Sequence, residues 1–291
     1  MSKHWDLIDK GALCKVIDVN MDKYPEGFPI HLLFDAHQDN PKADRAMMQR
    51  HLREICNAGG AVLIGGDFYC AMQGKYDKRA CKSSVRPENQ SGEYLDTLVT
   101  GGQKQLANWV DNIAVFGYGN HETSILRHQE TDLIKRTAHR LGCMDALGAY
   151  GGWLVVKMRS NGRVRATYKI RYFHGSGGGG PVTKGVIQTN RRQCIYSDVD
   201  AVVTGHVHED WAVTIPTESM NHKTGEQIIR EVLHVCTPTY KEEYKGARKG
   251  WHIERGAAPK PVGSTALILE LRRNSSEQRG YKAFADTRKL R

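Results

Sequence analysis

The sequence predicts an α/β fold in which two β-sheets pack together and helices flank them. In the first half of the chain, short apolar segments of strand character alternate with amphipathic helical segments, whereas strand segments dominate the second half. This succession is typical of two packed sheets rather than of one doubly wound sheet. The chain has 291 residues, 40% of them hydrophobic and 25% charged, so it is long enough to bury a large core and is globular in composition. We expect a single domain over residues 1–291.

The expected elements follow from apolar periodicity and from turn residues. Residues 1–28 are mixed in character, and we expect them to cover one edge of the fold. Apolar runs predict strands at 30–34, 61–64, 113–118, 201–204, 211–215, 227–236 and 265–271. Helical periodicity predicts helices at 41–58, 94–110 and 124–141. The pair Asn161-Gly162 predicts a tight turn, so we expect residues 153–158 and 167–173 to form a hairpin.

Several segments lack such periodicity. Residues 68–92 are rich in Lys and Arg and predict a long basic loop or insert of the kind that carries function. Residues 237–263 predict a second basic loop, whose mixture of bases and aromatic residues suits single-stranded nucleic acid and an ordinary surface loop about equally. The glycine run 177–180 lacks the Lys-Ser/Thr of a P-loop and predicts a flexible loop rather than a phosphate cradle. The last twenty residues predict a flexible basic tail.

The charge balance and the cysteines limit the partner and the compartment. A net charge of +10 and a pI of about 9.2 favour an anionic substrate or a polyanionic partner such as DNA or RNA. The seven cysteines are never spaced Cys-x-x-Cys, which argues against a disulfide framework or a zinc ribbon and favours the cytoplasm. No run reaches the roughly 18 apolar residues of a membrane span. The first residues lack the pattern of a signal peptide, so we expect no membrane association.

Five strand ends carry residue types that bind metals. The motifs are Asp35-Ala-His37, Gly65-Gly-Asp67, Gly119-Asn-His-Glu122, His174-Gly175 and Gly205-His206-Val-His208. Each follows an apolar run, and strand ends on one side of a fold open onto a shared crevice. A lone His-x-His would be weak evidence, but five such motifs in one order predict a metal site.

The possible ligands in these motifs are too many for one tetrahedral ion. They are Asp35, His37, Asp67, Asn120, His174, His206 and His208. A shared carboxylate could hold two divalent ions about 3.5–4 Å apart, the spacing that phosphoryl-transfer sites use. Mixed imidazole and oxygen ligands suit Mn, Fe, Zn or Ni, and they argue against a site for Mg alone or for Ca.

The five motifs, in this order, resemble the calcineurin-like metallophosphoesterase superfamily over about residues 30–208. The resemblance implies a four-layer α/β/β/α sandwich of two mixed β-sheets flanked by helices. It implies two divalent ions, with Mn the first expectation. In this pattern Asp35, His37 and His208 hold the first ion, Asn120, His174 and His206 hold the second, and Asp67 bridges them. The stretch 174–192 also resembles phosphoesterases encoded by tailed bacteriophages, which would place the protein in the host cytoplasm.

The resemblance implies an enzyme that hydrolyses phosphate esters. Hydroxide formed between the two ions would attack phosphorus in line, and His121 would protonate the leaving oxygen or stabilise its charge. Glu122 has two interpretations, since it could orient its neighbours or simply favour the start of a helix. Cys70 departs from the family pattern, because many members carry Asp, Asn or His three residues after the bridging Asp. The protein-phosphatase form Gly-Asp-x-x-Asp-Arg-Gly is absent, which favours the nuclease and phosphodiesterase branches.

We therefore expect a phosphodiesterase or nuclease acting on nucleic acid or nucleotides. A phosphomonoesterase acting on nucleotides, metabolites or phosphoprotein is the second interpretation, and an inactive nucleic-acid-binding module is the third. Expected substrate contacts are the bases Lys75, Lys78, Arg79, Arg191 and Arg192. The remaining histidines are interpreted as ordinary polar residues: His31, His51, His128, His139, His222, His234 and His252.

Overall fold

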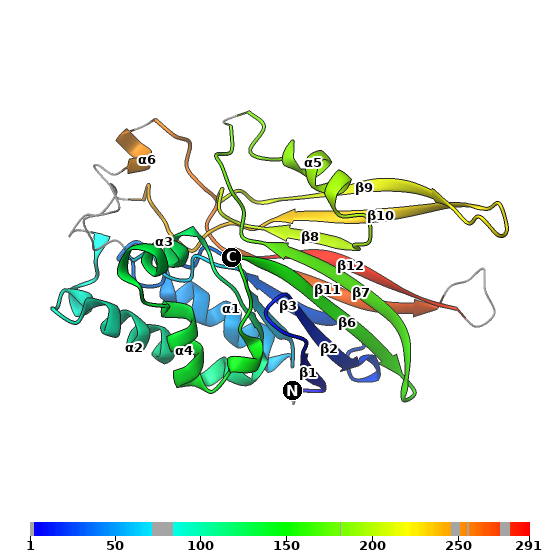
Figure 1. Cartoon of the computed structure of the whole chain (residues 1–291), viewed down its shortest axis with the longest axis horizontal. Coiled ribbons are helices and arrows are strands. Elements are labelled where there is room, and N and C mark those ends of the chain that lie inside the picture. Colours follow the sequence, from blue (N-terminus) through cyan, green and yellow to red (C-terminus); the bar gives the residue numbers. More distant parts are fainter. Residues whose placement is uncertain (1–2, 72–83, 181, 246–250, 255, 274–279) are drawn as a thin grey trace.

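Two mixed β-sheets form the centre of the molecule (Figure 1). The computed structural model describes residues 3–71, 84–180, 182–245, 251–254, 256–273 and 280–291. The seven-stranded sheet contains, in spatial order, β1 (Trp5–Asp9), β2 (Cys14–Asn20), β6 (Gly151–Ser160), β7 (Arg163–Phe173), β8 (Ala201–Thr204), β10 (Gln227–Cys236) and β9 (Trp211–Met220). The five-stranded sheet contains β12 (Tyr281–Leu290), β11 (Ser264–Arg273), β3 (Phe28–Leu33), β4 (Ala61–Ile64) and β5 (Ile113–Phe116).

The main core lies between the two sheets. Strand β3 shows how the sequence builds it, because its side chains alternate between the two faces of the sheet. Ile30 and Leu32 face the second sheet and pack with residues such as Leu154 and Val156 of β6. Leu33 of β3 instead joins the apolar cluster beneath the helices. Because the strand is buried on both faces, its sequence is apolar except for the buried His31, rather than a polar–apolar alternation.

Helices cover the other face of the five-stranded sheet (Figure 1). The α-helices are α1 (Arg45–Asn57), α2 (Tyr94–Leu106), α3 (Asn120–Gln129), α4 (Leu133–Leu141), α5 (Gln188–Ile195) and α6 (Trp251–Glu254). Short 3-10 turns occur at Met21–Lys23, Pro87–Asn89, Ala107–Asn112 and Met144–Ala146. In α1, the carboxylate of Asp44 caps the helix by accepting from the backbone N–H of Met47, at 2.8 Å. Met48 and Leu52 lie on the buried face of α1.

The outer face of the seven-stranded sheet carries α5 and the chain that follows it. Val199, Val202 and Val232 form a small apolar cluster there, against which Trp153 and Tyr196 pack. The α/β architecture of two mixed sheets flanked by helices is thus confirmed. Among the described residues, no helix is both long and apolar enough to cross a membrane.

Three local predictions are wrong. The helix expected at 124–141 is two helices, because Glu130 adopts a left-handed conformation with φ of 52° and Asp132 then caps α4. The C-terminal segment, expected to be a flexible tail, contains β12, which pairs with β11 along its whole length. Residues 1–28 supply β1 and β2, so they form the edge of a sheet instead of covering one. Successive side chains of β12 alternate between more and less exposed positions. Its sequence is therefore largely polar and has no apolar run that would predict a strand.

Candidate metal centre

The seven predicted ligands meet at one edge of the two sheets. Strands β3, β4 and β5 are mutually parallel, as are β7 and β8, so the five motifs leave their strands toward this edge. Among the described residues, one group of converging ligand atoms is Asp35, His37 and His208, and another is Asp67, His174 and His206. Within each group the ligand atoms lie within 4.8 Å of one another. Oδ1 of Asn120, the seventh residue, lies 3.2 Å from Nε2 of His174.

The backbone at five of these ligands is left-handed. The φ angles are 49° at Asp35, 45° at His37, 49° at Asp67, 69° at His206 and 55° at His208. This conformation costs free energy for residues other than glycine, and it persists where surrounding structure enforces it. Here the loops enforce it on each other, since Asp35 N–H donates to Gly66 O and His37 N–H donates to Asp67 O. In this conformation the side chains of the five residues converge on one site.

The two carboxylates are held in the same way. One oxygen of each accepts a backbone N–H: Asp67 Oδ1 from His121 at 3.0 Å, and Asp35 Oδ2 from His206 at 2.7 Å. The other oxygen of each faces an imidazole, with Asp67 Oδ2 lying 3.3 Å from His174 Nε2 and Asp35 Oδ1 lying 3.3 Å from His208 Nε2. Asp35 Oδ1 is buried and accepts no hydrogen bond. A buried oxygen of this kind facing imidazole nitrogens fits a divalent cation, so the residues present suit the metals implied by the resemblance.

Glycine is required next to each carboxylate. A Cβ at Gly119 would lie 2.0 Å from Asp67 Oδ1, and a Cβ at Gly205 would lie 2.3 Å from Asp35 Oδ2. Real Cβ atoms do not approach this closely, and both oxygens are anchored by the backbone bonds described above. The glycines of the Gly-Asn-His-Glu and Gly-His-x-His motifs therefore serve the geometry of the carboxylates.

The histidines of the site differ in the charge state that their surroundings favour. Burial, together with the charge of a neighbouring histidine, lowers the pKa of His37 and of His206, so both favour the neutral form that binds cations. At His174, Nδ1 lies 3.2 Å from the carbonyl of Gly65, which only accepts, so Nδ1 carries a proton and Nε2 is the atom that faces Asp67. Burial disfavours a charge on His174, but the Asp67 carboxylate outweighs it and raises the pKa to about 9. That same negative potential attracts a cation.

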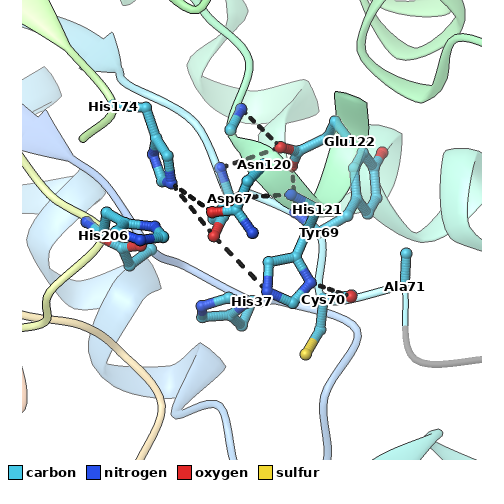
Figure 2. A network of polar contacts seen from close by, with 12 residues as sticks. His37, Asp67, Tyr69, Cys70, Ala71, Asn120, His121, Glu122, His174 and His206 are labelled. Carbon is cyan, nitrogen blue, oxygen red and sulfur yellow. Dashed lines mark hydrogen bonds and ion pairs between the residues drawn. The ribbon is translucent and has the colours of Figure 1, made fainter. Parts of the chain in front are cut away.

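His121 lies beside the carboxylate of Asp67 (Figure 2). Its Nδ1 donates to the carbonyl oxygen of Cys70 at 2.6 Å, and its Nε2 lies 3.7 Å from Asp67 Oδ2. The ring is only 7% exposed. A third group of converging ligand atoms consists of His37, Cys70 and His121. The side chain of Cys70 therefore belongs to the site, although its residue type departs from the family pattern.

Two buried carboxylates orient the loop that carries Asp67. Glu122 accepts backbone N–H groups of Asp67, Tyr69 and Gly119, at 3.1, 2.8 and 2.8 Å (Figure 2). Glu122 therefore orients its neighbours, and through the Gly119 N–H it also caps the start of α3, so both interpretations of this residue apply. Burial, with the charge of Asp67, raises its pKa to about 8.

Asp39 holds the next residues in a similar way, although no sequence motif marks it. It accepts from Cys70 N–H at 2.5 Å and from Ala71 N–H at 2.8 Å. Lys241 was missed as well, since it lies in a long basic segment and no motif marks it. Its charge acts on both His37 and Cys70, which places this lysine beside the site.

The predicted substrate contacts are less well placed. Lys75, Lys78 and Arg79 lie outside the described residues. Arg191 is exposed on α5. Arg192 is turned toward the sheet, where it donates to Thr204 Oγ1 at 3.1 Å and lies over the ring of Phe173.

The remaining histidines do not join the three ligand groups among the described residues. His31, His51 and His234 are buried and hydrogen-bonded to Tyr240 or Gln193, whereas His128, His139 and His222 are exposed. The side chain of His252 lies outside the described residues.

Neither a family model nor a curated protein sequence matches this chain. Among solved structures, a predicted phosphoesterase from Streptococcus pneumoniae TIGR4 is similar at 11% identity and a TM-score of 0.31, over 89% of this chain and 98% of that one. Vps29 from Chaetomium thermophilum is similar at 9% identity and a TM-score of 0.35, over 91% and 98%. At such low identities and TM-scores these similarities carry no assignment of activity. This chain has two mixed β-sheets flanked by helices, the fold that the resemblance to the calcineurin-like metallophosphoesterase superfamily implies. Its five motifs meet at one edge of these sheets.

Proposed function

We propose that the protein is a dinuclear metal-dependent phosphoesterase, and that it is a phosphodiesterase or nuclease acting on nucleic acid or nucleotides. The observation that carries the proposal is the pair of adjacent ligand groups, Asp35–His37–His208 and Asp67–His174–His206. Each combines a carboxylate with two imidazoles, a donor set suited to Mn, Fe, Zn or Ni. Mn is the first metal to test.

The proposed ligands divide as the resemblance implies. Asp35, His37 and His208 hold one ion, Asn120, His174 and His206 hold the other, and Asp67 bridges. A pair of divalent ions supplies two things when bound, a lowered pKa for water and electrostatic stabilisation of phosphate oxygens. The chain contributes rigid placement, because the carboxylates and His174 are fixed by backbone hydrogen bonds before any ion arrives.

His121 is the proposed general acid. The Cys70 carbonyl accepts a hydrogen bond from Nδ1–H and fixes the ring, so Nε2 is the atom directed at the site. A proton on Nε2 would pass to the leaving oxygen as its bond to phosphorus breaks. This placement also argues against the inactive binding module, because a structural metal site has no use for a buried imidazole beside its ligands.

The diester preference is supported by sequence rather than by a substrate contact. The chain is basic overall, with a net charge of +10, and lacks the protein-phosphatase motif after Asp67. One observation bears on the phosphomonoesterase alternative: the charge of Lys241, which is ion-paired with Glu243, acts on His37. A monoester carries more negative charge than a diester, so an extra cation would help its binding more.

The test compares bis-p-nitrophenyl phosphate with p-nitrophenyl phosphate in the presence of Mn²⁺, with single- and double-stranded DNA and RNA in parallel. Cleavage of the diester and degradation of a nucleic acid support the proposal. Cleavage of the monoester alone selects the alternative. Absence of activity on every substrate, with two ions bound, would contradict both.

A further inference from the structure

A thiol lies beside the proposed dinuclear centre, in a position that the catalytic assignment does not use. The ligand atoms of His37, Cys70 and His121 lie within 4.8 Å of one another, and all three residues are buried. They come from three separate segments, the loops after β3 and β4 and the start of α3. Figure 2 shows the sulfur of Cys70 below the two imidazole rings.

The thiol is held firmly in place. Cys70 N–H donates to Asp39, its carbonyl accepts from His121, and its Sγ accepts from Asn40 Nδ2 at 3.2 Å. The hydrogen bond from Asn40 fixes the position of the sulfur, which is a weak acceptor, within the site. Cys70 itself is 0% exposed, so the sulfur is buried within the site.

A second observation points to a ligand. His37 is 2% exposed, and its Nδ1 is buried without a hydrogen-bond partner. The backbone of this residue is also left-handed, at φ of 45°. At His121, the proton held on Nδ1 leaves the Nε2 lone pair directed inward. Two imidazoles and a thiol therefore converge beside the Asp67 carboxylate, whose Oδ2 lies 3.7 Å from His121 Nε2.

We propose that His37, Cys70 and His121 form a third cation site that selects thiophilic divalent ions such as Zn²⁺. Thiolate sulfur prefers soft and borderline ions over Mn²⁺ or Mg²⁺, whereas the carboxylate-rich groups accept the harder ions. On binding, the thiol proton of Cys70 leaves to solvent and a sulfur–metal bond forms. The ion competes for His37 with the ion at Asp35 and His208, and it occupies His121. Zinc-group ions in excess should therefore inhibit the enzyme. This consequence rests on the proposed function, whereas the existence of the cation site does not depend on that function.

The test uses Cd²⁺ as a probe, because cadmium–thiolate bonds give a charge-transfer absorption band in the ultraviolet. The full chain is loaded with Mn²⁺, titrated with Cd²⁺, and followed by absorption and by elemental analysis of bound Mn and Cd. We expect a charge-transfer band that saturates at one Cd²⁺ per chain, with loss of bound Mn as His37 is taken. In Cys70→Ser the band should disappear and Cd²⁺ affinity should fall by at least about tenfold.

The matched controls are Cys194→Ser, which removes an exposed thiol, and Cys236→Ser, which removes a buried thiol outside the three ligand groups. Both should keep the band. His121→Gln should weaken Cd²⁺ binding while Cys70 remains, which guards against a folding defect in the serine variant. A band that persists unchanged in Cys70→Ser, or that is lost only in Cys194→Ser, would overturn the site. Neither readout requires phosphoesterase activity, so failure of the proposed function is detected separately.

Discussion

The Cys70 carbonyl oxygen lies 2.6 Å from Nδ1 of His121 and fixes this imidazole against the carboxylate of Asp67. Replacing His121 with alanine should lower kcat on a diester by about 10²–10⁴-fold, the usual contribution of a general acid. Because His121 is not one of the proposed ligands of the two ions, both should remain bound. The matched control is His128→Ala, an exposed histidine on the same helix. Equal kcat values for the two variants would contradict the assigned role.

Asp67 should be needed for both ions. Its carboxylate lies 3.3 Å from His174 Nε2 of its own ligand group and acts electrostatically on His37 of the other group. Asp67→Asn keeps the size of the side chain and can still accept from the His121 N–H, but it removes the charge. We expect elemental analysis to find both ions lost or nearly so, whereas the exposed Asp145→Asn keeps them. Two ions still bound to Asp67→Asn would exclude a bridging role.

Gly119 and Gly205 should tolerate no side chain. A methyl group at either position would collide with a carboxylate oxygen, at 2.0 and 2.3 Å respectively. Gly119→Ala and Gly205→Ala should therefore weaken metal binding more than about tenfold, because the ligand carboxylate must move. Titration with Mn²⁺ measures this affinity. Gly178→Ala is the control, since a Cβ there meets nothing within 4 Å. Wild-type affinity in both site variants would show that the carboxylates can shift freely.

The sequence predicted those parts of the molecule that are decided by local pattern. Strands buried on both faces, such as β4 and β8, are apolar runs and were located within a residue or two. The candidate metal ligands could be recognised as one set because the carboxyl ends of parallel strands meet at one edge of a sheet. Helix α5 was missed, because its sequence is polar and tertiary contacts hold it: Arg192 with Thr204, and Gln193 with His234. Asp39 was missed for a similar reason, since its backbone partners 31 and 32 residues away are set only by the fold.

Glu122 should act by positioning the loop of Asp67. It accepts three backbone N–H groups, which a carboxylate with two oxygens can do. In Glu122→Gln one oxygen becomes an N–H donor that faces other donors. We expect the free energy of unfolding to fall by about 1–3 kcal/mol and metal affinity to fall with it. Chemical denaturation and Mn²⁺ titration measure the two effects. A variant with wild-type stability and weaker metal binding would instead make Glu122 a purely electrostatic contributor.

The buried His234 should make the protein less stable in acid. Burial, followed by the charge of Arg192, lowers its pKa to about 4, while an unfolded histidine titrates near 6.5. Between these values the unfolded chain binds a proton that the folded chain does not, so the free energy of unfolding falls as the pH falls from 6.5 toward 4. Between pH 7 and pH 5 this residue should account for about 1–2 kcal/mol of the loss. Urea unfolding of His234→Gln should show a correspondingly smaller loss. The control is His222→Gln, which replaces an exposed histidine and should behave as wild type. If wild type, His234→Gln and His222→Gln all show the same pH dependence, His234 becomes protonated without cost to the fold.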